Sequence, residues 1–517
     1  MKEVPVIVSV LLSLSVVQGA NILGIWFHGG RSHHILGEIL FKELARRGHN
    51  VTMASPFPLK EAFPNYTDIY LSGILEDQES RSKIFMEMKE GGFSKTLEVM
   101  PALIKSQTEI TLANKEMKRL INSGTKFDVI IMDWFLNLAI LYFGKLWRAP
   151  IIPVASFGTV DIGTVFTGNP EEPSYIPRFG VDLPQNMSFQ QRVFNAFLFL
   201  VSKVIIGNYI AYHQNLIKKH FNDTMTEEEM SDTIALILSN AHYSFESPRP
   251  YVPNIIPIGG FHIPTSENMP KKFQDFLDSA DNGAIFFSLG SNVKSTTLPA
   301  KTLQDILKVF SNLPYKIIFK WEDEDIKDRP KNVLISKWCP QNAILAHNNV
   351  KLFISHGGLL STIEAIYHAV PVLGIPIFGD QKINIPSAVK KGYAVQLNLE
   401  ELNEKTFSNA INELIDNPRY KDKVEKLSFL LKDQPLPPMD TAVFWVEHVI
   451  RHKGGFHLKN YGIRLPWYQY YMVDVIFFLT SIIFSILAFT YIIIRKMITI
   501  FRNKSDINGQ NGKVKIN

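Results

Sequence analysis

Near its carboxyl end the chain carries twenty consecutive uncharged residues, Val475–Ile494. An α-helix rises about 1.5 Å per residue, so this length is enough to cross the ~30 Å hydrocarbon core of a bilayer. Four aromatic residues precede the segment and four cations follow it: Trp467, Tyr468, Tyr470, Tyr471, Arg495, Lys496, Arg502 and Lys504. Because aromatic side chains favour the membrane interface and cations stay in the cytosol, we predict a transmembrane helix at 475–494 and a cytosolic tail at 495–517.

The amino-terminal end predicts the compartment. Residues 1–19 resemble a secretory signal peptide, because Lys2 precedes a long apolar stretch and Gly19 suits cleavage. The alternative is a buried first strand, although a better strand candidate follows at once. A signal peptide would make this a single-pass type I membrane protein with its domains in the lumen. Lys513 and Lys515 resemble a dilysine signal for the endoplasmic reticulum, and four glycosylation sequons would be lumenal, at Asn50, Asn65, Asn186 and Asn222.

Length and composition exclude several classes of protein. The 517 residues exceed one domain of the usual ~100–200 residues, so two large domains are expected. Hydrophobic residues make up 46% of the chain, which excludes disorder as the main state. The net charge of +5 gives no basic footprint for nucleic acid. A single cysteine, Cys339, excludes an intrachain disulfide and a cysteine-ligated zinc site.

Short apolar runs alternate with longer amphipathic segments, which is the pattern of parallel α/β units. In the first half the predicted strands are Ile22–Phe27, Val51–Ser55, Val129–Met132, Ile151–Ala155 and His242–Phe245. In the second half they are Ile256–Ile258, Ala284–Leu289, Lys316–Phe319, Val333–Ser336, Lys351–Ile354, Val372–Ile375 and Ala394–Leu397. After the first strand, Ser32 is the predicted cap of a helix that Gly48 ends.

A proline-rich stretch that begins at Ser247 separates the two halves. We therefore predict an α/β fold with two Rossmann-like, doubly wound domains that face one cleft. The predicted parts are an N-terminal domain at 20–246, a linker at 247–262, a C-terminal domain at 263–455 and a juxtamembrane segment at 456–474. Ligands in such sheets bind at the carboxyl ends of strands, so the strand-to-helix loops should carry the chemistry.

A second apolar stretch, Arg192–Gly207, is shorter than a membrane span and contains Asn195 and Lys203. The favoured interpretation is a core helix. The alternatives are a wall of an apolar substrate site and a helix that touches the membrane.

The strand Lys351–Ile354 runs into Ser355-His356-Gly357-Gly358, and a helix is predicted to follow. Two glycines at such a turn let a ligand approach the backbone, and the first-turn amides and the helix dipole favour a phosphate. His356 adds a hydrogen-bond donor, and Glu364 lies two helical turns further along the same face. This spacing suits a pyrophosphate at the helix tip and a ribose held by the carboxylate.

The flanking motifs make the signal specific. Trp338-Cys339-Pro340-Gln341 precedes this segment, and Phe378-Gly379-Asp380-Gln381 closes it. Together they resemble the signature of the UDP-glycosyltransferase superfamily, of the UDP-glucuronosyltransferase-like kind, and the chain is most similar to insect-type membrane-bound members. The resemblance covers essentially the whole chain and implies the GT-B fold. The chain departs from the commonest pattern at Leu360, where an Asn usually sits.

The resemblance implies that a UDP-sugar binds in the C-terminal domain. Each residue of the motif taken alone could also have a purely structural role, but the spacing of all of them together favours nucleotide binding. Trp338 would stack on uracil, Gln341 would bond the uracil or ribose, and Glu364 would hold the ribose hydroxyls. The diphosphate would be held by His356, by the amides near Gly357, Gly358 and Ser361, and by Ser291. Asp380 and Gln381 would bond hydroxyls of the transferred sugar.

Transfer of a sugar to a hydroxyl group needs a base, and an imidazole with its near-neutral pKa suits that task. His33 and His34 both lie at the start of the first predicted helix, and composition does not choose between them. The family's Ser-His pattern selects His33, so His28 and His34 are interpreted as structural or exposed. The resemblance identifies Asp133 as the carboxylate that orients the base. Asp128, at the start of the same strand, is the alternative and would lie at the wrong end of the sheet.

Together these features imply an inverting hexosyltransferase that moves glucose from UDP-glucose to hydroxyl groups of small lipophilic acceptors, as in detoxification. Relatives that use UDP-glucuronate often carry an Arg where this chain has Asn240, which favours glucose. No metal or other cofactor is expected, and a homo-oligomer is left open. The alternatives are a glucuronosyltransferase, a catalytically inactive membrane-tethered protein that binds lipophiles, and a UDP-sugar epimerase or hydrolase on the same fold.

Overall fold

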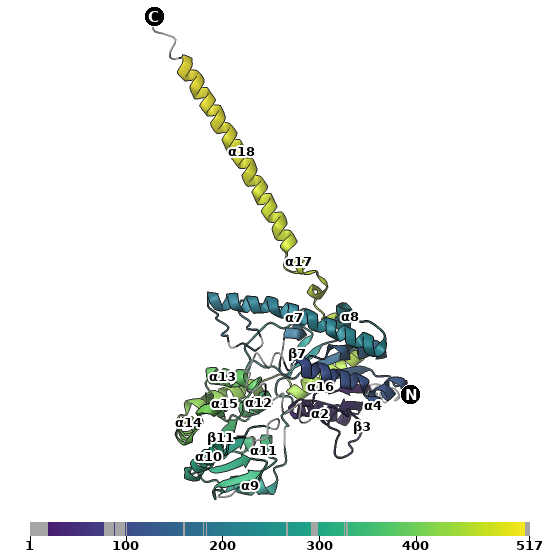
Figure 1. Cartoon of the computed structure of the whole chain (residues 1–517), viewed down its shortest axis with the longest axis vertical. Helices are drawn as coiled ribbons and strands as arrows, with labels where there is room; N and C mark the ends of the chain where they lie inside the picture. The colour runs from purple at the N-terminus through teal and green to yellow at the C-terminus, as the bar shows by residue number, and fades with distance from the viewer. Residues whose placement is uncertain are drawn as a thin grey trace, which may run out of the picture. The chain divides into compact units, whose positions relative to one another are not determined.

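The structure, a computed structural model, describes residues 19–76, 87, 99, 101–158, 161–178, 180–181, 183–264, 267–290, 298–324, 326 and 329–511 (Figure 1). Most of the predicted signal peptide, Ser291, Lys513 and Lys515 lie outside these residues. The chain divides into two compact units, Met1–Lys459 and Asn460–Asn517.

The first sheet has seven parallel strands in the order β3-β2-β1-β4-β5-β6-β7. Their bounds are β1 Asn21–Ile25, β2 Asn50–Ser55, β3 Tyr66–Tyr70, β4 Val129–Asp133, β5 Ile151–Ala155, β6 Ile237–Ser239 and β7 Ile255–Pro257. Both β4 and β5 are buried at every position, as strands covered on both faces should be. The strand order reverses between β1 and β4, and doubly wound sheets bind ligands at this kind of switch point.

The sequence-based strand predictions for this sheet need three corrections. His242–Phe245 is a turn, because the backbone N–H of Ser244 donates to Nδ1 of His242 (3.2 Å), and β6 lies earlier in the chain. The strand predicted at Ile256–Ile258 belongs to the first sheet as β7, so the predicted linker contributes a strand to the N-terminal domain. The edge strand β3 was missed, because its partly exposed residues form no apolar run.

Helices surround this sheet in the N-terminal domain. They are α2 Arg31–Arg46, α4 Lys115–Asn122, η1 Leu138–Leu141, α5 Tyr142–Trp147, α6 Asp161–Val165, α7 Phe189–Phe221 and α8 Glu227–Thr233. The helix predicted after the first strand is α2, and it buries Leu36, Leu40 and Leu44. Its cap was wrongly predicted, because Gly30 occupies the cap position and Ser32 lies inside the helix.

The second sheet has six parallel strands in the order β10-β9-β8-β11-β12-β13. Their bounds, within one or two residues of the prediction, are β8 Ala284–Ser288, β9 Lys316–Lys320, β10 Val333–Ser336, β11 Val350–Ser355, β12 Val372–Gly374 and β13 Ala394–Gln396. The helices are α9 Lys271–Asp278, α10 Ala300–Asn312, α11 Gln341–Ala346, α12 Leu359–Tyr367, α13 Gln381–Lys391, η3 Leu399–Glu401, α14 Glu404–Asp416 and α15 Arg419–Lys432. Here the switch point lies between β8 and β11.

The helix α16, Pro438–His452, packs against the N-terminal domain although it follows the second sheet in the chain (Figure 1). Its buried valines share one core cluster with Leu36 and Leu40 of α2: Val443, Val446 and Val449. Asp440 of α16 forms an ion pair with Arg47 just beyond α2. Residues 438–452 therefore pack on the first sheet, although the C-terminal domain predicted at 263–455 includes them.

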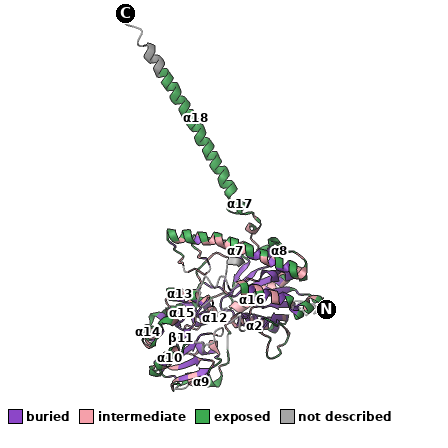
Figure 2. Ribbon diagram, in the orientation of Figure 1, coloured by how far each residue is buried: buried purple, intermediate pink, exposed green. Residues whose placement is uncertain are grey.

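The helix α7 contains the apolar stretch predicted as a core helix, and it has two different halves (Figure 2). In the second half, Ile210, Leu216 and Ile217 are buried in the core. In the first half, seven large apolar side chains are 49–72% exposed: Phe189, Val193, Phe194, Phe197, Leu200, Val204 and Ile205. The core-helix interpretation of Arg192–Gly207 is therefore wrong. The substrate-site and membrane interpretations stay predictions.

The second unit contains η5 Tyr461–Arg464, α17 Trp467–Tyr470 and α18 Val473–Asn511. The predicted span at 475–494 lies inside α18. Its side chains are exposed from Val473 to Lys504, as Figure 2 shows. This helix is long and apolar enough to cross a membrane.

Candidate active site

His33 and Asp133 meet at the switch point of the first sheet. His33 lies in the first turn of α2, directly after β1, and Asp133 is the last residue of the neighbouring strand β4. Nδ1 of His33 is 2.9 Å from Oδ2 of Asp133 and 3.2 Å from Oδ1, and both side chains are buried. A carboxylate in this place holds the proton on Nδ1, so that Nε2 is free to take a proton from a substrate. Asp128, the alternative, lies at the opposite end of β4 and accepts a hydrogen bond from the backbone N–H of Asn21 (2.8 Å).

Neighbouring groups fix the geometry of this pair. The hydroxyl of Ser156 donates to Oδ1 of Asp133 (2.7 Å). The imidazole of His33 packs against the rings of Phe135 and Phe157, with centroids 4.9 and 5.0 Å away. Ser156 was missed at the sequence level, although it directly follows β5, the strand next to β4. Its place directly after a predicted strand could have identified it, because the carboxyl ends of neighbouring parallel strands meet at one edge of the sheet.

The two other histidines near the base have structural contacts. His34 is buried, and its Nε2 lies 3.1 Å from Oε2 of Glu38 one turn along α2. The hydrogen bond with His34, together with Lys42, lowers the pKa of Glu38 to about 2. The Nδ1 atom of His28 accepts a hydrogen bond from the backbone N–H of Gly30 (2.9 Å). These contacts agree with the structural interpretation of both residues.

In the second sheet, the loops after β8 and β11 meet at His356. A Cβ atom at Gly290 would lie 2.6 Å from Nε2 of His356, and one at Gly358 would lie 2.8 Å from the same atom. Only glycine therefore leaves room for the imidazole between these two loops. Burial, and then the charge of Lys320, lower the pKa of His356 to about 4, so that it is neutral at pH 7. Ser291, predicted as a second phosphate contact, lies outside the described residues.

Three residues predicted to bind the nucleotide are in contact with one another. Glu364 in α12 is 7% exposed. The side-chain amide of Gln341 donates to Oε2 of Glu364 and to the hydroxyl of Ser361 (2.9 Å). The amide of Asn342 donates to Oε1 of Glu364 (3.3 Å). The carboxylate is thus held by donors at the start of α11.

Trp338 follows β10 and is 62% exposed, so its flat ring can accept a stacking base. The Nζ atom of Lys320 lies 5.4 Å from the centroid of this ring and donates to the carbonyl oxygen of Gly290 (2.7 Å). Burial lowers the pKa of Lys320. This lysine was missed at the sequence level, although it ends β9 next to the phosphate-facing loops. Its ammonium group therefore lies beside the loop that follows β8.

The two residues predicted to bind the sugar differ in their contacts. Asp380 directly precedes α13, and its carboxylate accepts a hydrogen bond from Asn384 (2.8 Å). Burial raises the pKa of Asp380, and the hydrogen bond from Asn384 is the largest of the effects that oppose this rise. Gln381 is buried, and its Oε1 accepts from the backbone N–H groups of Ile377 and Phe378. In this structure Gln381 therefore shapes its own loop.

Two positions differ from the common family pattern. Asn240 is fully buried, and its amide donates to the backbone carbonyl of Ser156 (3.2 Å). Because this side chain contacts backbone on its own domain, it does not read the donor sugar directly. Leu360 packs against the core cluster that includes α2 and α16.

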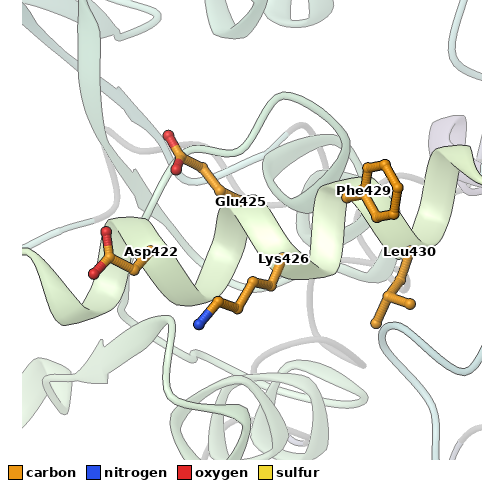
Figure 3. Close-up of a pocket in the computed structure, with 5 residues that line it drawn as sticks. All are labelled: Asp422, Glu425, Lys426, Phe429 and Leu430. Carbon is orange, nitrogen blue, oxygen red and sulfur yellow. The ribbon is translucent and has the colours of Figure 1, made fainter.

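A surface hollow also lies along one face of α15, as Figure 3 shows. Its lining side chains all come from that helix and all are exposed: Asp422, Glu425, Lys426, Phe429 and Leu430. No predicted site residue lines it, so we assign it no function.

Solved structures share this architecture of two parallel sheets. The glycosyltransferase of kitacinnamycin aligns with a TM-score of 0.56 and 15% identity over 83% of this chain and 99% of its own. The glycosyltransferase VinC aligns with a TM-score of 0.55 and 16% identity over 84% of this chain and 100% of its own. At such identities the likeness shows the fold alone. That fold is GT-B, and it confirms the predicted fold class.

Sequence comparison places the chain within that class. The family model described as UDP-glucoronosyl and UDP-glucosyl transferase matches residues 29–510. The chain is 36% identical to UDP-glucosyltransferase 2 of Dactylopius coccus over 94% of this chain and 93% of the relative. It is 35% identical to UDP-glycosyltransferase UGT5 of the same insect over 92% of this chain and 92% of the relative. It is 31% identical to UDP-glucuronosyltransferase 2C1 of Oryctolagus cuniculus over 88% of this chain and 94% of the relative. The chain belongs to the UDP-glycosyltransferase family and is an enzyme.

Proposed function

We propose that the enzyme transfers glucose from UDP-glucose to hydroxyl groups of small lipophilic acceptors, with inversion at the anomeric carbon. The observation that carries this proposal is the buried pair of His33 and Asp133. It lies at the switch point of one sheet, while Leu360 of α12 in the other domain packs against the core cluster that contains Leu36 and Leu40 of α2. A base and a nucleotide-binding loop system therefore come together from two domains.

In the proposed reaction, Nε2 of His33 takes the proton of the acceptor hydroxyl as its oxygen attacks the anomeric carbon. The new carbon–oxygen bond forms while the bond from the anomeric carbon to the β-phosphate oxygen breaks. Asp133 stabilises the imidazolium that results, because its carboxylate faces Nδ1. The single in-line displacement inverts the anomeric centre, and UDP leaves with the bonding electrons.

The leaving UDP carries developing negative charge, which preorganised donors stabilise. The N-terminus of α12, the imidazole of His356 and the ammonium of Lys320 surround the loops where the diphosphate would lie. These groups supply that charge stabilisation in our proposal, so no metal ion is included in it. Trp338 would stack on the uracil, and Glu364 would bind the ribose hydroxyls.

The choice of glucose is supported by the similarity to a relative named as a glucosyltransferase. The rabbit relative is named as a glucuronosyltransferase, so UDP-glucuronate is the second candidate donor. Asn240 adds no direct contact to either argument, because its side chain is buried and donates to the backbone carbonyl of Ser156. Competition between the two UDP-sugars at equal concentration decides the donor, and a larger yield of glucuronide would reject glucose.

We also propose that the catalytic unit lies in the lumen of the endoplasmic reticulum as a glycoprotein. All four sequon asparagines are exposed, at Asn50, Asn65, Asn186 and Asn222. The side-chain amides of Asn50 and Asn65 donate to Asn21 and to the carbonyl of Ala45, so we expect Asn186 and Asn222 to carry most of the glycan. Removal of N-glycans by a glycosidase should lower the apparent mass of microsomal protein. An unchanged mass would argue against a lumenal domain.

The decisive assay uses the full chain in microsomes with a panel of lipophilic phenols and alcohols, and it detects conjugates by mass. The expected product gains one hexose, and the His33→Ala variant should form almost none. A folded His33→Ala variant with unchanged activity would reject the mechanism. UDP-glucose binding without any conjugate would favour the inactive binding protein instead.

A further inference from the structure

One buried histidine that has no role so far faces the carboxylate proposed to bind ribose. His262 is 2% exposed, and its Nε2 lies 3.5 Å from Oε1 of Glu364. Within the part of the chain that the structure describes, neither ring nitrogen of His262 has a hydrogen-bond partner. A buried polar atom without a hydrogen-bond partner destabilises the fold, because the loss of its contacts with water is not compensated. An apolar side chain would therefore be more stable here unless the imidazole has a task.

The position of His262 in the chain connects it to the N-terminal domain. It follows β7 in a turn in which the backbone N–H of Ile263 donates to the carbonyl of Gly260 (3.0 Å). Gly260 has a φ of +89°, which favours glycine, and its own N–H donates to Oδ1 of Asn240 (3.4 Å). The side chain that presents His262 to Glu364 thus starts from a turn anchored on a buried asparagine.

Asn240 in turn is linked to the catalytic pair. Its amide donates to the carbonyl of Ser156, whose hydroxyl donates to Asp133. Polar contacts therefore run from Asp133 through Ser156 and Asn240 to the turn at Gly260. From that turn, His262 reaches across to Glu364 on α12 of the other domain. Buried polar networks of this kind fix geometry when their members are paired.

The proposed reaction needs such a fixed geometry. Glu364 would hold the nucleotide, while Asp133 orients the base that must reach the acceptor hydroxyl next to the anomeric carbon. A misplacement of about 1 Å between reacting groups can lower a rate roughly 10²-fold. A contact between the two domains that fixes both carboxylates would therefore serve catalysis directly.

We propose that His262 is a positioning residue that holds Glu364 for the ribose and, through Gly260 and Asn240, keeps it in register with the pair of His33 and Asp133. This proposal rests on the proposed role of Glu364 in ribose binding. An approach of about half an ångström converts the 3.5 Å separation into a hydrogen bond from the imidazole N–H to the carboxylate.

The test compares His262→Leu with His262→Gln in the full-length protein reconstituted in lipid nanodiscs. Calorimetry measures the Kd of UDP, and steady-state kinetics separate kcat from the KM values of donor and acceptor. His262→Leu should raise the Kd of UDP and the KM of the donor roughly tenfold, as expected for loss of one charge-assisted hydrogen bond. The KM of the acceptor should not change. His262→Gln keeps an N–H donor and should restore most of the affinity.

His213→Leu is the matched control, because His213 is also fully buried with an unpaired Nε2 but lies in α7. It should lower the melting temperature and leave the Kd of UDP unchanged. Two results would overturn the proposal: wild-type UDP affinity and donor KM in folded His262→Leu, or equal weakening in the Leu and Gln variants, which marks a space-filling role. A separate variant, Glu364→Gln, tests the proposed function itself. If Glu364 does not bind the ribose, this variant should bind UDP as tightly as the wild type.

A double-mutant cycle keeps the proposal testable if His262→Leu does not fold. Asn240→Ala and His262→Ala are combined, and kcat/KM for the donor is measured for both single variants and the double variant. Coupled residues should give a double loss that differs at least threefold from the product of the single losses. If the loss in the double variant equals the product of the two single losses, the two side chains are not energetically coupled through Gly260, and the proposed link between the domains is wrong.

Discussion

Replacement of Asp133 by Asn tests the proposed base most directly. Asn has nearly the same shape, and its amide oxygen can still accept the hydrogen bond from Ser156. Its NH₂ group, however, would face Nδ1 of His33 at the 2.9 Å position now occupied by a carboxylate oxygen. The imidazole would then carry its proton on Nε2, where it cannot accept one from the acceptor. In hydrolases with a comparable triad this wrong tautomer lowers kcat about 10⁴-fold, or roughly 5 kcal/mol.

The change should affect stability much less than activity. Loss of one charge-assisted hydrogen bond in a buried site costs about 1–3 kcal/mol, which lowers the melting temperature by a few degrees. The assay is the initial rate at saturating UDP-sugar and acceptor, with folding checked by the Kd of UDP. Asp128→Asn is the matched control, because it changes the same residue type at the opposite end of β4 and should keep kcat. A folded Asp133→Asn enzyme within tenfold of the wild-type kcat would refute the reasoning.

Three further predictions concern the nucleotide site, pH and α7. Trp338→Ala should raise the Kd of UDP by about 5- to 160-fold, because stacking on a base contributes ~1–3 kcal/mol. The melting temperature should not fall, because the ring is 62% exposed. Unchanged affinity in calorimetry would contradict this prediction. Burial, and then nearby lysines, lower the pKa of His356 to about 4 and of His213 to about 3, so the unfolded chain binds more protons below about pH 6.5. Stability should therefore fall on acidification from pH 7 to pH 5, by about 2 kcal/mol for each histidine, and a melting temperature that rises would show the opposite linkage. Ile217→Ala should lower the free energy of unfolding by about 2–5 kcal/mol, because Ile217 is fully buried. Leu200→Gln should change it by less than about 0.5 kcal/mol, because Leu200 is 64% exposed. Equal losses in denaturant titrations would show that both halves of α7 are packed.

Local patterns were enough to predict most of the second sheet. The strands of that sheet are short apolar runs bounded by turn residues, and the structure places each within one or two residues of the prediction. The loop Ser355-His356-Gly357-Gly358 also lies where a strand turns into a helix, as its glycines indicate. Prediction failed where neighbours decide the conformation, as at His242, whose ring accepts a backbone hydrogen bond and closes a turn.

The candidate site was harder to predict from the chain alone. The resemblance selected His33 over His34, but the physical difference between them lies in distant partners, Asp133 for one and Glu38 for the other. Ser156, Lys320 and His262 were missed because each carries no motif. Their importance follows from what they touch at the sheet edges.

The sequence by itself determined the features that depend on near neighbours in the chain: the apolar span, the alternation of strands and helices, and the glycine turn at the head of α12. The tertiary structure alone decided which distant residues meet. Asp133 lies one hundred residues from His33, and Arg47 pairs with Asp440 at a separation of 393 residues. Such contacts form only when the sheets and helices pack, because burial in a shared interior, rather than local backbone preference, selects the partners.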